Sequence, residues 1–307
     1  MDSNVKSFNS TVKLHNSLEM PIFGFGTYLL QNVNENIKNA IKLGYRCIDT
    51  AKLYHNEDEI GKAINELLAD KTIKREDIFV TTKLWNDDQE DPVQELRNSL
   101  KRLQLDYVDL FLVHWPIGKT NEGVICKQTP IHIIWQNMEK CVELGLTKSI
   151  GVSNYSVQLL SNLISFAKIK PVCNQVEVHP LFSQEGLFHY CKQNDIAIVA
   201  YNPLCNGKSA RNNLEFDKYD LSKNKLLSEL AAKYKKTNAQ IILNWHVWRG
   251  VCVIPKSNNV ERQRENLESM NFKMEEEDYN KISNLNINKR FVLSKGKPFC
   301  KDYDVFA

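Results

Sequence analysis

The stretch GYRCIDTAKLYHNE, residues 44–57, contains one complete passage from helix to strand to helix. Gly44 ends an amphipathic helical pattern, and a short apolar strand follows it directly. The chain then places the carboxylate of Asp49 and the phenol of Tyr54 close to a helix start at Asn56. Taken alone, this is a capped loop in which Asp49 forms a surface salt bridge and Tyr54 packs as an amphipathic aromatic side chain. The pattern of the remaining chain favours a functional interpretation instead.

The same passage repeats along nearly the whole sequence. Most of its apolar segments are near-continuous runs of Val, Ile, Leu and Phe, as expected for parallel strands that are covered on both faces. Alternation of eight such strands with helices predicts a (β/α)8 TIM barrel formed by a single domain, residues 1–307. The predicted strands span residues 20–28, 45–50, 78–85, 108–115, 149–154, 172–178, 196–204 and 251–257.

An open, doubly wound sheet is the alternative architecture. Such a sheet usually has fewer strands, and its first strand leads into a GxGxxG turn that opens a helix. The corresponding segment here is GFGTY, residues 24–28, which contains only two glycines and does not open a helix of that type. The sequence therefore favours the closed barrel.

Several helix starts carry recognisable capping signals. Asp91 and Pro92 predict the N-cap and the first residue of one helix. Thr129, ahead of Pro130, is expected to cap another helix in the same way. After the last strand, Asn258 has capping-box spacing to a glutamate three residues later, which predicts a further helix start.

Three segments lie outside the repeat. Residues 12–21 predict a small β-hairpin ahead of the barrel, although Asn16-Ser17 makes a tight two-residue turn less favourable than Asn-Gly would. Residues 204–225 form a long polar loop after the seventh strand, and residues 286–307 form a tail with little regular pattern. Long loops of this kind in a compact domain are usually functional lids or disordered segments.

The composition argues against several classes of protein. The 307 residues are 42% hydrophobic and 25% charged with a net charge of +3, so nucleic-acid binding is not expected. The polar N-terminus lacks the apolar core of a secretory signal, and no run of about 18 apolar residues predicts a membrane span. Eight cysteines without CxxC or Cys–His spacing indicate reduced thiols and no metal site. We therefore expect a cytoplasmic protein that acts as a monomer.

Polar groups follow the apolar runs at seven of the eight predicted strand ends. In a TIM barrel these ends form one rim, where catalytic residues gather. A single histidine there would usually be a hydrogen-bonded core residue. Burying so many polar groups, however, costs too much free energy unless they bind one another or a ligand. The rim residues are Asp49, Lys83, His114, Ser153, Asn154, Gln175, Glu177, Tyr201, Lys256 and Ser257.

Four polar side chains together suit proton transfer to a carbonyl oxygen. The phenol of Tyr54 has an ordinary pKa of about 10, and a neighbouring Lys83 ammonium would lower that pKa. Asp49 would keep Lys83 charged, and His114 would orient the substrate oxygen by a hydrogen bond. Because no side chain supplies hydride, reduction at this site requires a nicotinamide cofactor.

The remaining rim groups suit such a cofactor. Neutral side chains at the ends of the fifth and sixth strands suit a carboxamide, and Tyr201 offers a flat face for a nicotinamide ring. The helix start after the eighth strand is basic and suits a phosphate, although a solvated basic helix start is the alternative there. The residues concerned are Ser153, Asn154 and Gln175 for the carboxamide, and Lys256, Ser257 and Arg262 for the phosphate.

In their order along the chain, these motifs resemble those of the aldo-keto reductase superfamily, in particular its aldose and xylose reductases. The resemblance covers almost everything from Val12 to about Leu285. It implies a (β/α)8 barrel that binds NADPH extended across the rim without a Rossmann fold. The motifs are GFGTY (24–28), GYRCIDTAKLYHNE (44–57), TTKLWN (81–86), LDYVDLFLVHWP (105–116), IGVSNY (150–155), NQVEVHP (174–180), AYNPL (200–204) and IPKSNNVERQREN (254–266).

The resemblance also implies a role for individual side chains. Its catalytic tetrad matches Asp49, Tyr54, Lys83 and His114, with Tyr54 as the general acid. The implied substrate contacts are Tyr28, Trp85, His114 and Trp115. The implied cofactor contacts are Thr27, Asp49, Ser153, Asn154, Gln175, Tyr201, Asn202, Leu204, Lys256, Ser257, Asn258, Arg262, Glu265 and Asn266.

The sequence departs from the family pattern at a few positions. Tyr28 stands where many aldose reductase-like members have Trp, and Asn202 and Cys205 replace the Ser and Gly of the usual Tyr-Ser-Pro-Leu-Gly. Lys208 and Leu29 lie about where aldose reductases carry an Asp–Lys pair that clasps the cofactor. We therefore expect that clasp to be absent and Lys208 to reach the pyrophosphate directly.

The expected activity is NADPH-dependent reduction of aldehydes and some ketones, with NADH as a weaker cofactor. The expected partner is a small carbonyl substrate. Binding to nucleic acid or to a membrane is not expected. A non-catalytic, NADPH-binding regulatory or structural member of the superfamily is the alternative. His114 argues against reduction of steroid double bonds, because members with that activity replace the histidine by glutamate. Reduction of sugars stays open.

Overall fold

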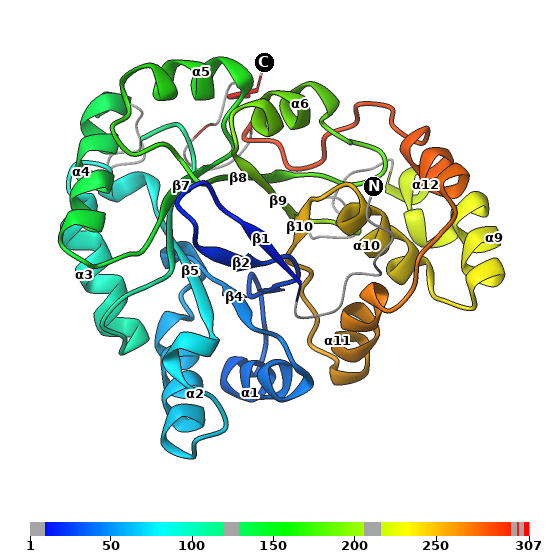
Figure 1. Ribbon diagram of the computed structural model, residues 1–307, viewed down its shortest axis with the longest axis horizontal. Coiled ribbons are helices and arrows are strands. Elements are labelled where there is room, and N and C mark those ends of the chain that lie inside the picture. The colour runs from blue at the N-terminus through cyan, green and yellow to red at the C-terminus, as the bar shows by residue number, and fades with distance from the viewer. Residues whose placement is uncertain (1–9, 119–128, 206–215, 296–299, 301–303, 307) are drawn as a thin grey trace.

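Eight parallel strands form one sheet that curls into a barrel, with helices around its outside (Figure 1). The computed structural model describes residues 10–118, 129–205, 216–295, 300 and 304–306 of the chain. Each strand pairs in parallel with the next one along the chain. The strands are β3 (Phe25–Gly26), β4 (Cys47–Asp49), β5 (Phe79–Leu84), β6 (Leu110–Val113), β7 (Ile150–Ser153), β8 (Cys173–Glu177), β9 (Ala197–Tyr201) and β10 (Cys252–Val253).

The barrel closes between its first and last strands. Phe23 forms a parallel bridge with Val253, and the Gly24 N–H donates to the Val253 carbonyl at 2.8 Å. The backbones approach so closely that a Cβ on Gly26 would lie 2.5 Å from the Ile254 carbonyl oxygen. Closure leaves the sheet without free edges, so the predicted TIM barrel is confirmed and the open sheet is wrong.

Most of the helices that surround the sheet turn an apolar face inward and a charged face toward solvent, whereas α10 (Asn238–Trp248) is buried over most of its length. On α3 (Pro92–Leu103), for example, Leu96, Leu100 and Leu103 are buried while Arg97 is exposed. No helix in the described part of the chain is long and apolar enough to cross a membrane. The other helices are α1 (Val33–Leu43), α2 (Glu57–Ala69), α4 (Ile131–Glu143), α5 (Val157–Phe166), α6 (Glu185–Gln193), α8 (Phe216–Tyr219), α9 (Lys225–Tyr234), α10 (Asn238–Trp248), α11 (Val260–Leu267) and α12 (Glu276–Ser283).

An antiparallel hairpin of β1 (Thr11–Lys13) and β2 (Glu19–Pro21) precedes the barrel, as predicted. Its turn is not the tight two-residue form, and Ser17 adopts a positive φ of 68°. The lack of glycine in Asn16-Ser17 accounts for the looser turn. The Asn16 amide donates to Ser149 Oγ at 2.8 Å, so the hairpin lies against the N-terminal end of β7, opposite the rim.

Several predicted helix ends hold, whereas the strands are shorter than predicted: β9 ends at Tyr201 and β10 at Val253, ahead of the predicted ends at residues 204 and 257. Gly44 ends α1 with a positive φ of 116°, and the Asp91 side chain accepts from an N–H in the first turn of α3. The predicted first strand, residues 20–28, is divided between β2 and β3, because the chain leaves the hairpin before it enters the barrel. Thr129 does not cap α4. Pro130 occupies the N-cap position in an extended conformation, which delays the helix start by one residue.

The predicted cap of α11 is also wrong by one residue. Asn259 is the N-cap, and its Oδ1 accepts from the Arg262 N–H at 2.9 Å. The Asn258 side chain does not cap the helix, and its Oδ1 accepts instead from the Gln31 N–H at 3.0 Å. This bond joins the segment after β10 to the segment after β3.

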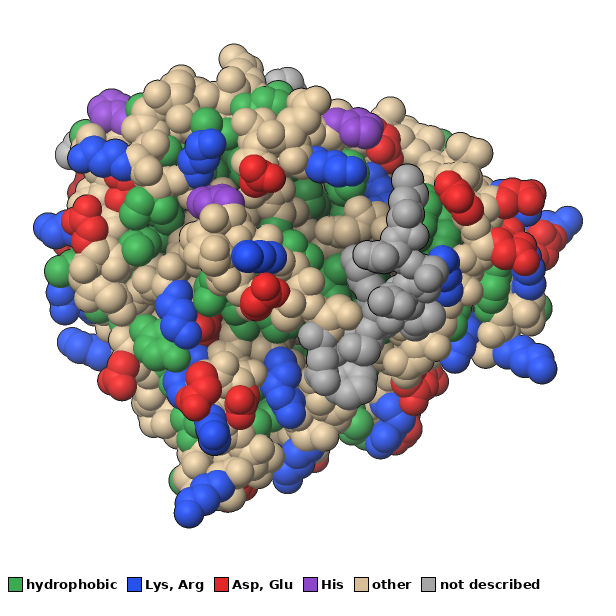
Figure 2. All heavy atoms as spheres, in the orientation of Figure 1, with side chains coloured by type: hydrophobic (Ala, Val, Ile, Leu, Met, Phe, Trp, Pro, Cys, Tyr) green, Lys and Arg blue, Asp and Glu red, His purple; other side chains and the backbone are tan. Residues whose placement is uncertain are grey.

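The long loop and the tail are described only in part. Residues 216–225 of the loop include α8 and a 3-10 turn, whereas residues 206–215 lie outside the described chain. The described residues of the tail form no helix, as expected from their sequence. Figure 2 shows Lys and Arg side chains interspersed with Asp and Glu over the face that it displays, without a continuous basic surface.

Candidate active site

A buried ion pair between Asp49 and Lys83 lies inside the rim of the barrel. The Lys83 side chain has no exposed surface, and its Nζ donates to Asp49 Oδ1 at 2.6 Å and to the Thr50 carbonyl at 2.8 Å. The second oxygen of Asp49 accepts from Gln175 Nε2 at 2.7 Å. Both carboxylate oxygens therefore have partners, and the geometry of the pair is fixed.

Tyr54 and His114 complete the predicted tetrad next to this pair. Tyr54 ends the 3-10 helix η1 (Lys52–Tyr54), and its hydroxyl lies 3.5 Å from Lys83 Nζ. The His114 ring follows β6 and meets the Tyr54 ring edge-on, with centroids 5.9 Å apart. Within the described chain, His114 Nδ1 is buried and has no hydrogen-bond partner. The structure thus brings all four predicted side chains together.

Burial controls the protonation of the site. Burial, followed by the charge of Asp49, raises the pKa of Tyr54 well above its ordinary value. The sequence predicted that Lys83 would lower this pKa, but the pKa shifts upward, because burial disfavours the charged phenolate. Burial, followed by the charge of Lys83, holds the pKa of His114 well below its ordinary value. At neutral pH the site presents a protonated phenol and a neutral imidazole.

Asn56 ties the segment that carries Tyr54 to two strand ends. Its Nδ2 donates to the Thr27 carbonyl at 3.0 Å, and its Oδ1 accepts from Thr50 Oγ1 at 2.7 Å. Asn56 is buried at the start of α2, but its side chain caps no N–H of that helix. The sequence indicated only a helix start here, whereas the structure shows a link between β3, β4 and the phenol.

Glu57 holds β5, the strand that carries Lys83, in a similar way. Its buried carboxylate accepts from Thr82 Oγ1 at 2.6 Å and from Arg102 Nε at 2.7 Å. Because Thr82 precedes Lys83 in β5, the bond fixes the strand beside the ion pair. Asn56 and Glu57 therefore explain why a carboxylate, a phenol and a helix start occur so close together in the sequence.

Hydrogen bonds connect the side chains that were predicted to hold a carboxamide. The Tyr201 hydroxyl donates to Asn154 Oδ1 at 2.6 Å, and Asn154 Nδ2 donates to the His114 carbonyl at 2.9 Å. Ser153 Oγ donates to the Gln175 carbonyl at 2.7 Å. Through the bond from the Gln175 amide to the ion pair, these residues and the tetrad form one continuous network.

Other predicted cofactor residues lie on the same rim. Thr27 Oγ1 donates to the Asp49 carbonyl at 2.9 Å. Asn202 follows β9 with a positive φ of 51°, and its amide donates to Glu177 Oε1 at 3.2 Å. Leu204 is partly buried against the core. Lys208 lies outside the described residues.

The predicted phosphate site lies at the start of α11. Arg262 is exposed in its first turn, and no carboxylate of the described residues forms an ion pair with it. Ser257 is nearly buried, and its Oγ accepts from the Asn259 N–H at 3.1 Å. Of the remaining predicted residues here, Lys256 is partly buried, Asn258 and Glu265 are exposed, and Asn266 is buried.

Gln263 holds this helix start in place, a role that no sequence pattern indicated. Its Nε2 donates to Asn36 Oδ1 at 2.8 Å and to the Ser257 carbonyl at 3.1 Å. The Tyr45 hydroxyl donates to the Gln263 carbonyl at 2.8 Å. The first turn of α11 is thereby fastened to α1 and the start of β4. A glutamine inside a polar helix carries no pattern that would reveal such long-range bonds.

Aromatic side chains lie beside the tetrad, and they include the predicted substrate contacts Tyr28, Trp85 and Trp115. Tyr28 is 49% exposed, and its ring centroid lies 5.0 Å from that of Tyr54. The Trp85 ring meets His114 edge-on, with centroids 5.1 Å apart. Trp115 packs against Phe306 of the tail at 5.7 Å, a contact that the irregular tail sequence did not indicate. These side chains give the site an apolar wall beside its polar network.

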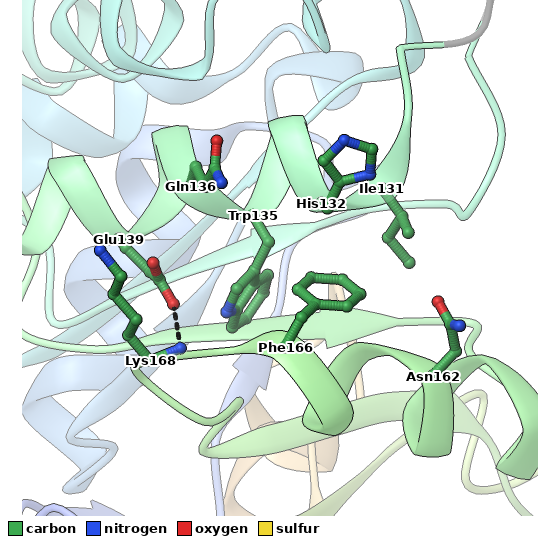
Figure 3. Close-up of a pocket in the computed structure, with 8 residues that line it drawn as sticks. All are labelled: Ile131, His132, Trp135, Gln136, Glu139, Asn162, Phe166 and Lys168. Carbon is green, nitrogen blue, oxygen red and sulfur yellow. Dashed lines mark hydrogen bonds between the residues drawn. The ribbon is translucent and has the colours of Figure 1, made fainter.

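A hollow lies on the outside of the barrel between α4 and α5 (Figure 3). Trp135 and Phe166 line it. The Trp135 indole donates to the Ile169 carbonyl at 2.9 Å, and Glu139 Oε1 accepts from the Lys168 N–H at 2.7 Å. These polar groups already bind the backbone, and the hollow shares no residue with the rim.

Comparisons with known proteins find similar sequences over nearly the whole chain. The model of the Aldo/keto reductase family matches residues 23–287. Aldose reductase C of Dictyostelium discoideum is 41% identical over 97% of each chain, and glyoxal reductase of Bacillus subtilis is 42% identical over 92% of this chain and 95% of its own. The crystal structure of a Bombyx mori aldo-keto reductase in complex with NADP is 35% identical and covers 92% of this chain and 94% of its own, with a TM-score of 0.85. The chain therefore belongs to the aldo/keto reductase family.

Proposed function

We propose that the protein reduces aldehydes and some ketones to alcohols with NADPH, and that Tyr54 donates the proton. The observation that carries this proposal is the buried Asp49–Lys83 pair, 3.5 Å from a protonated phenol and next to a neutral imidazole. The names of the similar proteins, which include aldose and glyoxal reductases, support the same reaction class.

The donor set of the rim fits a nicotinamide dinucleotide. Amide and hydroxyl groups of Ser153, Asn154 and Gln175 suit a carboxamide, and Tyr201 offers an aromatic face beside them. The exposed guanidinium of Arg262, at a helix N-terminus, suits a phosphate. When bound, the cofactor supplies the hydride that adds to the carbonyl carbon.

The side chains of the site supply the proton and the orientation. Tyr54 gives its hydroxyl proton to the carbonyl oxygen as the C–H bond forms at carbon, so one hydride and one proton yield the alcohol. Lys83 stabilises the phenolate that remains, and Asp49 keeps Lys83 charged. The neutral His114 imidazole orients the carbonyl oxygen toward the phenol.

Oxidation of NADPH in the presence of a simple aromatic aldehyde tests the proposal. We expect turnover that depends on both compounds and an alcohol product in equal amount to the NADPH consumed. Tight NADPH binding without turnover on a panel of aldehydes, ketones and sugars would favour a non-catalytic, cofactor-binding role instead. The apolar wall formed by Tyr28, Trp85 and Trp115 leads us to expect faster reduction of aromatic aldehydes than of sugars.

Replacing Arg262 by alanine is expected to weaken NADPH binding and leave NADH binding nearly unchanged. A charge-assisted contact to a phosphate is worth about 1.5–3 kcal/mol, which corresponds to a loss of about 10- to 100-fold in affinity. Fluorescence titration with both cofactors measures the effect. Arg264→Ala is the matched control, because Arg264 lies on the same helix and pairs with Glu261 at 3.6 Å. Equal losses for NADPH and NADH would show that Arg262 does not contact the 2′-phosphate.

Replacing Asn56 by alanine is expected to lower stability and kcat together. Its buried partners Thr27 and Thr50 lose a hydrogen bond each, at a cost of about 1–3 kcal/mol in the free energy of unfolding. The loosened segment then holds Tyr54 less well. Urea unfolding and steady-state kinetics measure the two effects. Asn65→Ala controls for stability alone, because Asn65 donates within α2 and to the Gln104 carbonyl. If kcat fell equally in both variants, Asn56 would have no special role in positioning the phenol.

A further inference from the structure

Glu177 ends β8 on the rim, and the proposed reaction gives it no task. Its carboxylate is completely buried. Oε2 accepts from the Val292 N–H at 2.9 Å and the Phe291 N–H at 3.2 Å, and Oε1 accepts from the Asn202 amide at 3.2 Å. The His179 ring nitrogen Nε2 lies 3.3 Å from Oε1. One carboxylate thus joins β8 to the segment after β9 and to the C-terminal tail.

The first connection leads to the predicted cofactor side of the site. Asn202 directly follows Tyr201, whose hydroxyl bonds Asn154 and so connects to the backbone of His114. A shift of Asn202 therefore moves the Tyr201 ring on which the nicotinamide is proposed to lie.

The second connection leads to the substrate side. Beyond the two residues that Glu177 holds, Ser294 Oγ donates to Asp304 Oδ1 at 2.7 Å and accepts from the Val305 N–H at 2.7 Å. These bonds bring Phe306 against Trp115 in the aromatic wall. The tail is further fixed where the Arg290 guanidinium lies 3.6 Å from the centroid of the Phe306 ring.

We propose that Glu177 is a positioning residue that couples cofactor binding at Tyr201 and Asn202 to the placement of the C-terminal tail over the substrate pocket. This inference rests on the proposed function, because it assigns the two ends of the connection to cofactor and substrate. A carboxylate suits the task because only acceptor oxygens can serve so many donors at once. An amide in its place would present an NH2 group to at least one of them.

The test is Glu177→Gln, studied by hydrogen–deuterium exchange of peptides that cover residues 286–295, with and without NADP⁺. In the wild type, we expect saturating NADP⁺ to slow exchange in this segment. In Glu177→Gln, we expect faster exchange that NADP⁺ no longer slows. We also expect the Kd for NADP⁺ and the KM for the aldehyde each to rise about tenfold, the loss that corresponds to one hydrogen bond to a charged group.

Two further variants separate coupling from simple loss of structure. Glu139→Gln is the matched control, since Glu139 is a buried carboxylate that accepts from the Lys168 and Ile169 N–H groups on the outside of the barrel. It should lose stability to a similar degree and keep the effect of NADP⁺ on the tail. Ser294→Ala loosens only the outer tail, so it should raise the KM for the aldehyde and leave the Kd for NADP⁺ unchanged.

The outcomes are distinct. An undiminished effect of NADP⁺ on tail exchange in Glu177→Gln would overturn the proposal. If that variant does not fold, Asn202→Ala tests the same connection from its other end: it removes the bond from Asn202 to Glu177, and at saturating NADP⁺ it should abolish the NADP⁺ effect on the tail. Failure of the wild type to bind NADP⁺ would refute the proposed function instead. In that case, hydrogen–deuterium exchange of the tail in ligand-free Glu177→Gln would still show whether the carboxylate holds the tail. Faster exchange than in the wild type is the expected result.

Discussion

Replacing Tyr54 by phenylalanine is expected to abolish carbonyl reduction while leaving NADPH binding unchanged. The phenol combines a transferable proton with a neighbouring cation, since Lys83 Nζ lies 3.5 Å from its hydroxyl. A positioned general acid typically contributes about two to four orders of magnitude to a rate, and kcat should fall by that amount. Phenylalanine preserves the ring that packs against Tyr28 and His114, so the pocket keeps its shape. Steady-state kinetics and fluorescence titration with NADPH measure the two quantities.

Tyr28→Phe is the matched control for this experiment. Its ring lies 5.0 Å from that of Tyr54, but the residue is half exposed. Loss of the Tyr28 hydroxyl should therefore change kcat only slightly. Substantial turnover in Tyr54→Phe would reject Tyr54 as the proton donor. Equal losses in the two variants would show that the Tyr54 hydroxyl has no special role in proton transfer.

The barrel could be predicted because its signals are local and repeated. Each apolar run, the glycine stop at Gly44 and the cap at Asp91 act over a few residues, and the structure bears them out. The convergence of Asp49, Lys83 and His114 was also predictable, since the strands of a barrel end on one rim. The caps at Thr129 and Asn258 failed for local reasons that spacing does not reveal, namely an extended proline and a competing bond to another loop.

The support around the site could not be predicted because it depends on contacts between distant residues. Glu177 binds the Val292 N–H across 115 positions of the chain, and no periodicity in the tail indicates that contact. Gln263 binds Asn36 across 227 positions. The direction in which the pKa of Tyr54 shifts depends on burial. A sequence motif indicates that an ammonium lies near the phenol, but it does not indicate that the phenol loses contact with solvent.

Replacing Lys83 by methionine is expected to cost both stability and turnover. Methionine fills most of the volume of the lysine but leaves the Asp49 carboxylate buried without its cation. Breaking a buried ion pair in this way typically costs about 3–5 kcal/mol in the free energy of unfolding, although the Gln175 amide still binds Asp49. Turnover falls for a separate reason, because Tyr54 loses the positive charge that stabilises its phenolate as the proton leaves. Urea unfolding and steady-state kinetics follow the two losses.

The double variant Asp49→Asn/Lys83→Met distinguishes these two effects. An asparagine carries no charge and can still accept a hydrogen bond from Gln175, so the uncompensated burial disappears and stability should return close to that of the wild type. Turnover should stay low, because no cation lies beside Tyr54 in either variant. Recovery of both stability and turnover would show that the pair serves only to hold the fold. Recovery of stability without recovery of turnover would show that proton transfer needs a positive charge beside the phenol. It would also show that the buried pair contributes to catalysis separately from its contribution to stability.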